Sequence, residues 1–367
     1  MTHMYFLADA YFHRLDPFVI EFREGFGIRW YGVAYAAGFL VAWLLARAWA
    51  RRGLVPLSPQ QIGDFMITAI LGVLLGGRVG WVLFYSPQAL WTFDSQIPYW
   101  EVLAIHRGGM ASHGGVIGVT VAMVWYGRRH GVSALQLLDF GVLVTPIGLM
   151  FGRIANFINS ELRGVVCADD FPLAVKFPKE IIEEWGVDQL RQVTEAARYL
   201  DSSRAAWAAP LDMASDFRAQ GMELPDSLIH TLEGMRLSVY SAVMNGNQYV
   251  IEVVAPVLPS RHPSQLYQAA AEGLVLGGLL WLIWLIWKPK HAGVLGSLFL
   301  VIYGILRIVT EIWRLPDEGV ERIMGLSRGQ LLSTFMIVFG LALVFWLVRR
   351  PLPPSEQEQE EPAQPKS

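Results

Sequence analysis

The chain has little of what soluble and secreted proteins usually carry. Only 17% of its 367 residues are charged, against roughly 25% in a typical soluble domain. Its single cysteine, Cys167, cannot form an intramolecular disulfide. The 29 basic residues do not outnumber the 32 acidic ones, and no basic surface suited to nucleic acid is evident. These shortages argue against a disulfide-stabilised secreted domain and against a nucleic-acid-binding protein.

Apolar sequence is abundant instead, and it occurs in long runs. Hydrophobic residues make up 53% of the chain. A helix needs about 20 apolar residues to cross roughly 30 Å of hydrocarbon. Seven segments approach that length, at about 30–49, 62–85, 108–126, 135–158, 266–287, 293–313 and 330–348. The pattern predicts an all-α polytopic membrane protein with seven transmembrane helices, of which the third is interrupted by glycines and His113.

Basic residues predict the orientation of these helices, because cytoplasmic loops carry an excess of lysine and arginine. They follow the first, third, fifth and seventh segments, at Arg47, Arg51, Arg52, Arg128, Arg129, Lys288, Lys290, Arg349 and Arg350. Those ends are therefore expected in the cytoplasm, with the N-terminus outside and the C-terminus inside.

Five parts follow from this topology. Residues 1–29 form an outer, interfacial arm, and 30–164 the first four transmembrane helices. Residues 165–260 form an extracytoplasmic head domain, 261–350 the last three helices, and 351–367 a disordered cytoplasmic tail. The head carries 14 acidic and 7 basic residues. Alternating apolar residues predict strand structure over 18–30, a mixed pattern predicts helix over 180–200, and 248–258 is predicted as a strand.

A polar stripe marks the end of the fourth segment. At 100° per residue, Arg153, Asn156 and Ser160 fall within about 60° of one another on a helix. Asn159 lies beside them, and Glu161 follows. Because polar groups are costly inside a membrane, an arginine there indicates a functional site by default.

Other polar groups occur near the outer ends of the segments. His113 is surrounded by glycines, and His262 lies where the chain re-enters the membrane. Tyr303, Arg307 and Glu311 share one helix face at i, i+4 spacing. Glycines at four-residue spacing, such as Gly72, Gly76, Gly80, Gly114, Gly118, Gly148 and Gly152, favour close helix packing.

Three predicted intramembrane arginines, Arg78, Arg153 and Arg307, indicate recognition of a phosphate, since the guanidinium fork matches phosphate oxygens. No metal site is expected, because the histidines lack a ligand set with known spacing such as His-Glu-x-x-His. Cys167 is expected to be incidental rather than a nucleophile.

Taken together, these motifs resemble the prolipoprotein diacylglyceryl transferase family. The matching stretches occur in the family's order, from the first segment towards the last. They are WYG at 30–32, GGRVGWVLFY at 76–85, HGGVIGV at 113–119, GRIANFINSELRG at 152–164, HPSQLYQAAAEG at 262–273 and YGILRIVTEIWRLPD at 303–317.

The resemblance implies a seven-helix fold with an outer head domain in the bacterial inner membrane. It also implies the first step of lipoprotein maturation. The diacylglyceryl group of phosphatidylglycerol, a membrane lipid, passes to the lipobox cysteine in the signal peptide of a preprolipoprotein. A thioether forms and glycerol 1-phosphate leaves. No metal or organic cofactor is expected.

The resemblance further implies roles for individual residues. His113 matches the family's proposed base, and Arg153, Arg307 and Glu311 match catalytic positions. The expected phosphatidylglycerol-binding residues are Tyr31, Arg78, Arg153, Asn156, Glu161, Tyr303 and Arg307. His262, Asn159 and Gly164 are expected to support the site.

The chain departs from the family pattern in a few places. Ala155 and Ser160 stand where glycine is usual, and Arg163 where an aromatic residue is common. The insertion after Gly164 is longer than usual. These departures leave the expected polar site residues in place.

Two other classes of function use some of the same features. Buried arginines and glycine-rich helices also suit a small-anion transporter or channel, although no paired repeat with interrupted helices is evident. A non-catalytic membrane scaffold could use the outer insertion for binding, but it would not require the buried charges.

Overall fold

The computed structural model describes residues 10–23, 26–95, 97–105, 108–200, 204–316 and 325–351. These residues form two compact units. The first comprises the described residues within Met1–Ala34, Gly152–Ala269 and Thr310–Val320. The second comprises those within Tyr35–Phe151, Ala270–Val309 and Glu321–Ser367. Apart from Pro351, the predicted tail lies outside the described residues.

Long helices match the predicted segments to within a few residues. They are α1 (Trp30–Arg51), α2 (Pro59–Phe84), α3 (Ser112–His130), α4 (Ala134–Ile158), α12 (Val294–Glu311) and α13 (Arg328–Val348). The remaining span, Ser264–Trp287, consists of α10 (Ser264–Gln268) and α11 (Leu276–Leu282), with π-helical turns at Ala269–Val275 and Ile283–Trp287. Such turns are rare and often occur at functional sites.

Among the described residues, six helices are long and apolar enough to cross a membrane: α1, α2, α4, the span Ser264–Trp287, α12 and α13. The helix α3 is not one of them, because its glycine-rich start and its end at Arg128, Arg129 and His130 lower its hydropathy. On α13, Phe335, Val338 and Phe339 are exposed, as lipid-facing side chains would be. The chain is therefore a mostly helical polytopic membrane protein.

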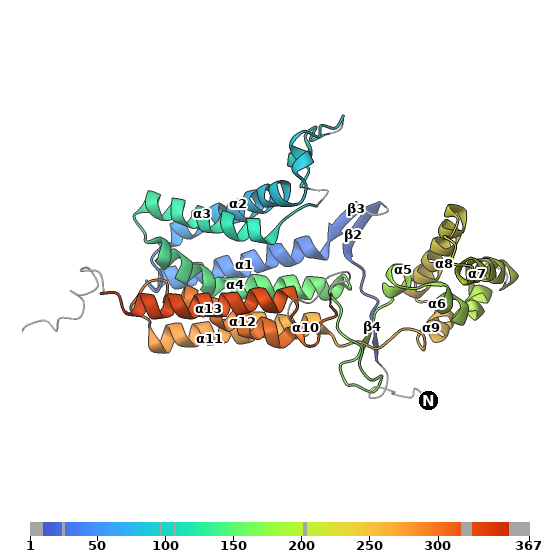
Figure 1. Cartoon of the computed structure of the whole chain (residues 1–367). Coiled ribbons are helices and arrows are strands. Elements are labelled where there is room, and N and C mark those ends of the chain that lie inside the picture. The colour runs from blue at the N-terminus through green and yellow to red at the C-terminus, as the bar shows by residue number, and fades with distance from the viewer. Residues whose placement is uncertain are drawn as a thin grey trace, which may run out of the picture. The chain divides into compact units, whose positions relative to one another are not determined.

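Glycines hold α2 and α3 together in the second unit, where the two helices lie side by side (Figure 1). A Cβ added at Gly76 would lie 2.4 Å from the Gly114 carbonyl oxygen. One added at Gly118 would lie 2.0 Å from that of Gly72. Side chains at these positions would separate the helices. By contrast, a Cβ at Gly148 would meet nothing within 4 Å.

Polar side chains define where several helices begin. Ser58 and Gln61 form a capping box at the start of α2, which satisfies backbone N–H groups that have no partner within the helix. Asp139 of α4 accepts hydrogen bonds from the N–H groups of Gly293 (2.6 Å) and Gly296 (2.7 Å) at the start of α12. This carboxylate therefore caps a neighbouring helix within the second unit.

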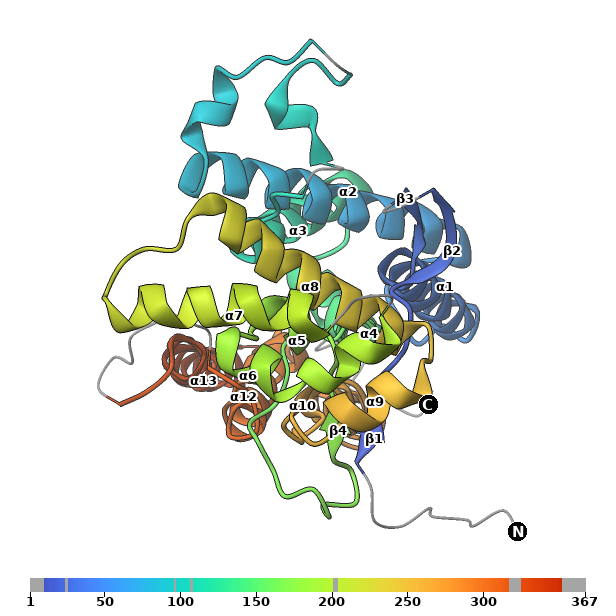
Figure 2. The same ribbon diagram turned by 90° about the vertical axis from the view of Figure 1, so that its right-hand side faces the viewer.

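The head lies in the first unit and is helical. It contains α5 (Glu180–Glu183), α6 (Val187–Gln192), α7 (Arg204–Ala219), α8 (Asp226–Met244) and α9 (Gln248–Val254). The helices α7 and α8 lie next to each other (Figure 2). Their core includes Leu211, Ala214, Leu228, Leu232, Val239 and Val243.

The strand predicted over 248–258 is wrong, because the structure has the helix α9 there. The Asn247 side chain accepts a hydrogen bond from the Val250 N–H (3.3 Å) and so caps this helix. Val250 and Val254, one turn apart, are both buried in the head core. Tertiary packing thus outweighs the β propensity of this valine-rich stretch.

Short strands join the N-terminal arm to the rest of the first unit. The strand β1 (Tyr11–Phe12) pairs in parallel with β4 (Val175–Lys176). The predicted strand structure before α1 is confirmed as an antiparallel hairpin of β2 (Phe18–Arg23) and β3 (Phe26–Arg29). The arm, the head and the end of α4 therefore belong to one compact unit.

Candidate active site

Three of the predicted binding residues meet at the end of α4. The Asn156 amide donates to the Tyr31 hydroxyl (2.5 Å) and to the Glu161 carboxylate (3.3 Å). The Tyr31 hydroxyl donates to the same carboxylate oxygen of Glu161. Tyr31 thus forms one hydrogen-bonded group with two residues that lie 125 and 130 positions further along the chain. This group fixes the Glu161 carboxylate in place. Arg153, one turn before Asn156, is half-buried.

The predicted polar stripe ends sooner than expected. The helix α4 stops at Ile158, so Ser160 and Glu161 lie beyond it rather than on its face. Ser160 and Leu162 adopt left-handed backbone conformations, with φ of 54° and 53°. The Asn159 amide donates to the Ala155 carbonyl (2.8 Å) and closes the last turn. Glu161 is thus carried by a sharp turn.

His13 also belongs to this region, although no sequence pattern indicated it. Its side chain is 1% exposed, and its Nδ1 lies 3.1 Å from the Ser160 hydroxyl. The ring packs edge-on against Phe157 with 4.9 Å between centroids. Burial lowers the pKa of His13 to about 4, so the imidazole is neutral at pH 7. A lone histidine in a polar arm carries no motif by which it could have been found.

Gly164 lies where three chain segments meet. A Cβ there would lie 2.1 Å from the His262 carbonyl oxygen and 2.8 Å from that of Trp313. Gly164 also forms an antiparallel bridge with Arg314. Close approach of the backbones explains why this position suits glycine. This close approach brings the segment after Glu311 beside the end of the matching stretch 152–164.

The predicted supporting residue His262 also takes part in this meeting point. Its Nδ1 lies 3.2 Å from the Tyr267 hydroxyl, and its ring packs against Phe171 with 4.7 Å between centroids. Glu311 lies 3.8 Å from the Arg314 guanidinium. His262 and Glu311 therefore belong to the same unit as Asn156 and Glu161.

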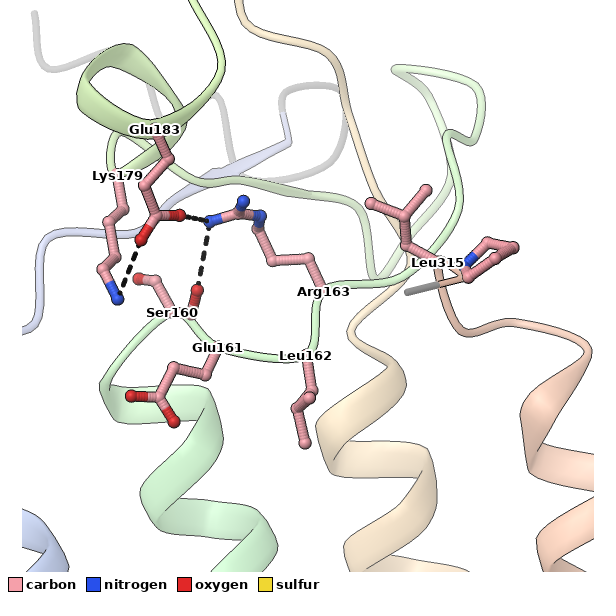
Figure 3. A pocket seen from close by; sticks show the side chains of 8 residues that line it. Ser160, Glu161, Leu162, Arg163, Lys179, Glu183 and Leu315 are labelled. Carbon is pink, nitrogen blue, oxygen red and sulfur yellow. Dashed lines mark hydrogen bonds and ion pairs between the residues drawn. The ribbon is translucent and has the colours of Figure 1, made fainter. Parts of the chain in front are cut away.

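A cluster of ion pairs holds the turn around Glu161 from the head side. Arg163 donates to Glu183 (2.7 Å), to Glu184 and to the Ser160 carbonyl (3.2 Å). Figure 3 shows Arg163 reaching back towards Glu183, which also pairs with Lys179 (3.2 Å). Burial by itself would lower the pKa of Arg163, but the hydrogen bond with Glu183 and the nearby carboxylates raise it overall. Arg163 therefore remains a cation.

A second arginine, Arg261, shares Glu184 with Arg163, at 3.1 Å from its guanidinium. Arg261 binds Glu180 through two hydrogen bonds, of 2.6 Å and 3.1 Å, and Glu180 is only 2% exposed. Burial raises the pKa of Glu180, although the hydrogen bond and charge of Arg261 oppose this shift. Nothing in the sequence pattern indicated that the head would supply partners for both arginines.

Two cavities adjoin Glu161 within the first unit. The larger, about 370 Å³, is lined by residues that include Arg163, Lys179 and Leu315 (Figure 3). The smaller, about 150 Å³, is lined by residues that include His13 and Arg29. Small-molecule sites usually occupy 300–1,000 Å³, and the volume of the larger cavity lies within this range.

The other predicted site residues belong to the second unit. His113 lies in the first turn of α3 and is exposed. Tyr303 and Arg307 lie one turn apart on α12 and are half-buried. Arg78 of α2 is 4% exposed and hydrogen-bonds to backbone carbonyls, a use that the sequence did not indicate. Whether Arg78 also contacts a lipid phosphate stays a prediction.

Comparison with known proteins identifies the family. The family model for prolipoprotein diacylglyceryl transferase matches residues 17–346. The chain belongs to the prolipoprotein diacylglyceryl transferase family. A phosphatidylglycerol--prolipoprotein diacylglyceryl transferase of Bdellovibrio bacteriovorus is 42% identical over 336 residues, covering 91% of this chain and 93% of the relative.

Other members of the prolipoprotein diacylglyceryl transferase family match over nearly the whole length. A protein with the same name from Xylella fastidiosa is 36% identical over 94% of this chain and 98% of its own. One from Phenylobacterium zucineum is 34% identical over 96% of this chain and 99% of its own.

Within the described part of the chain, no three His, Cys, Asp or Glu side chains form a group that could hold a metal ion.

Proposed function

We propose that this chain transfers the diacylglyceryl group of phosphatidylglycerol to the lipobox cysteine of preprolipoproteins, the first step of lipoprotein maturation. The observation that carries the proposal is the similarity to transferases of this name over more than nine tenths of both chains. The hydrogen-bonded group of Tyr31, Asn156 and Glu161 supports it. No metal or organic cofactor takes part in the proposed reaction.

The nucleophile comes from the substrate, and a base on the enzyme activates it. A free thiol has a pKa of about 8.5, so only a few per cent is thiolate at pH 7. His113 accepts the thiol proton in this proposal. The sulfur then attacks the glyceryl carbon, a C–S bond forms, and the bond from that carbon to the phosphate oxygen breaks. The thioether and glycerol 1-phosphate are the products.

Negative charge develops on the departing phosphate ester, and arginines stabilise it. We assign this role to Arg153 and Arg307, with Glu311 orienting Arg307. Tyr303 and Asn156 position the lipid head group. In a water-poor site, such prearranged donors contribute several kcal/mol to the transition state. Glu161, fixed by Tyr31 and Asn156, is suited to accept hydrogen bonds from the head-group hydroxyls.

The proposed topology brings both substrates to the outer face of the bacterial inner membrane. Basic residues after α1, α3 and α13 are expected in the cytoplasm. With α3 as a seventh span alongside the six candidates, the N-terminus and the head at 165–260 lie outside. The C-terminus lies in the cytoplasm. A secreted preprolipoprotein would present its cysteine on the head side.

The test is a transfer assay with purified protein in detergent, radiolabelled phosphatidylglycerol and a lipobox peptide. We expect Arg153→Ala and Arg307→Ala each to lower kcat by about 100- to 1,000-fold, by analogy with loss of one oxyanion donor. Arg191→Ala is a matched control, because Arg191 pairs with Asp212 (2.8 Å) on the head surface. It should keep wild-type activity.

Near-wild-type rates in both variants would contradict the phosphate-stabilising role. Substitution of His113 by glutamine tests the base in the same assay, and retained activity would mean that another group takes the thiol proton. Anion flux through reconstituted vesicles without phosphatidylglycerol would favour a transporter instead.

A further inference from the structure

The Arg78 guanidinium is enclosed by backbone carbonyls. Its Nε donates to Val102 (2.7 Å), and its Nη1 donates to Gly108 (2.7 Å) and Gly109 (3.0 Å). Its Nη2 donates to Glu101. A guanidinium has five N–H groups, and these bonds engage all three of its nitrogens. Little donor capacity therefore remains for the oxygens of a lipid phosphate.

The surrounding packing fits this arginine closely. Its guanidinium carbon lies 4.4 Å from the centroid of the Trp81 ring, a cation–π contact. Gly109, at φ 74°, covers both groups: an added Cβ would lie 2.5 Å from Arg78 Nη1 and 2.8 Å from the Trp81 ring. The site is thus built around the arginine and leaves no room for a side chain at Gly109.

The chain held by Arg78 leads directly into α3. The Ala111 N–H donates to the Gly77 carbonyl (2.9 Å). A Cβ at Gly114 would lie 2.3 Å from the Gly76 carbonyl oxygen, so the backbone beside His113 lies against α2. Hydrogen bonds before His113 and close glycine packing after it therefore fix the position of the first turn of α3 against α2.

We infer that Arg78 is a positioning residue for His113, fixing the backbone on which the histidine enters α3, and that it is not a ligand of the lipid phosphate. This inference rests on the proposed function, in which His113 is the base. Displacement of a reacting group by about 1 Å can cost about 100-fold in rate. The effect of losing Arg78 should consequently fall on kcat and not on lipid binding.

The assay compares Arg78→Ala, Arg78→Lys and His113→Gln with wild type, measuring kcat and the KM for phosphatidylglycerol. We expect Arg78→Ala to lower kcat by about 10- to 100-fold with KM changed less than about twofold. Arg78→Lys should recover little, because one ammonium cannot reproduce a planar fork. Arg128→Ala, an exposed arginine at the other end of α3, should behave as wild type.

Two further readouts distinguish positioning from a general loss of structure. The Arg78→Ala/His113→Gln double variant should be no slower than His113→Gln alone, because residues that act through one another are non-additive. The pH–rate profile of Arg78→Ala should resemble that of His113→Gln, with the rate rising towards the thiol pKa of about 8.5. Gly109→Ala, which crowds the same guanidinium, gives an independent variant should Arg78→Ala not fold.

A raised KM with unchanged kcat would overturn the inference in favour of a lipid contact. Independent, multiplicative losses in the double variant would overturn it too, as would full activity of Arg78→Ala or His113→Gln. In each of these cases wild type still transfers diacylglyceryl, so the proposed function stands. Absence of transfer by the wild-type protein would contradict both.

Discussion

The backbone that carries Glu161 is bent by the residues on either side of it. Ser160 and Leu162 both occupy the left-handed region, which costs residues with a Cβ roughly 1–2 kcal/mol each. Side chains from other segments stabilise this turn. The Ser160 hydroxyl contacts His13, and Ser264 donates to the Leu162 carbonyl (2.8 Å). A strained turn held from two directions keeps the carboxylate in one position.

Protonation of His13 should destabilise this turn. Its pKa of about 4 in the folded protein lies below the usual 6.5. At a pH between these two pKa values, His13 carries a proton in the unfolded chain but not in the folded chain. The contribution of His13 is therefore full above pH 6.5 and is lost as the pH falls towards 4. At 1.36 kcal/mol per pKa unit, at most about 3 kcal/mol is lost, measurable by thermal unfolding across pH 4–8.

A non-titrating variant isolates this effect from the other titrating groups of the chain. His13→Gln keeps a polar group near Ser160 but cannot gain a proton in this range. We expect it to be less stable than wild type at pH 7.5 and to lose less stability on acidification. Parallel pH profiles for the two proteins would show that His13 does not titrate as its burial indicates.

At the scale of elements, the packing of α2 on α3 depends on glycine. Gly118→Ala would place a Cβ 2.0 Å from the Gly72 carbonyl oxygen. Overpacking of this kind typically costs 1–3 kcal/mol or more. Gly148→Ala is the matched control, because its Cβ would meet nothing within 4 Å and alanine favours helix by about 1 kcal/mol. Thermal unfolding in detergent should show Gly118→Ala melting lower and Gly148→Ala unchanged or higher.

If both variants melt at the wild-type temperature, close contact of these helices does not limit stability. The comparison also shows what sequence spacing can reveal. Gly114 and Gly118 have the same four-residue spacing as Gly148 and Gly152. A Cβ at either of the first two would clash with the backbone of α2, whereas a Cβ at either of the last two would meet nothing within 4 Å. Spacing identifies a helix face with small residues, but it does not identify the neighbour of that face.

The helix α5 illustrates how a departure from the family pattern can be accommodated. Arg163 stands where an aromatic residue is common, and α5 and its flanks supply Glu183 and Glu184 as its partners. Glu180 on the same helix binds Arg261. The Arg261–Glu180 pair is buried, and breaking a buried pair by removing one partner is strongly destabilising. The long insertion thus helps to hold the turn that carries Glu161.

Much of the helical framework could be predicted, because the length and hydropathy of a segment are enough to recognise a transmembrane helix. The contacts that shape the site could not. The predicted segment and α4 both end at Ile158, but Ser160 continues the helical periodicity of the sequence, and only the fold shows that it lies on a turn. His13 lies 147 positions from Ser160, a separation that no local pattern covers. Arg78 was predicted as an intramembrane cation, but its partners are backbone carbonyls at 101–102 and 108–109, which no side-chain pattern reveals.

At the scale of the whole molecule, the predicted site residues divide between the two units. Tyr31, Asn156 and Glu161 belong to the first unit, and His113 and Arg307 to the second. The family resemblance assigns all of them to one reaction. The kinetic variants described above test residues of each unit separately.

The proposed topology can be tested with the one native cysteine. Cys167 lies in the head region and is partly exposed, so a membrane-impermeant maleimide should label it in intact spheroplasts. Burial and the charge of Asp169 raise its pKa, so labelling should be slow at pH 7 and faster at pH 8.5. In a Cys167→Ser background, Arg52→Cys after α1 should react only after permeabilisation.

Cys167→Ser should also retain wild-type transfer activity, because the reacting thiol belongs to the peptide substrate. A large loss of kcat in that variant would assign the enzyme's own cysteine to the chemistry. Labelling of Arg52→Cys in sealed spheroplasts, together with labelling of the native Cys167 only after permeabilisation, would instead place the head in the cytoplasm. The second outcome would reverse the orientation that the basic residues predict, and the head would then face away from secreted substrates.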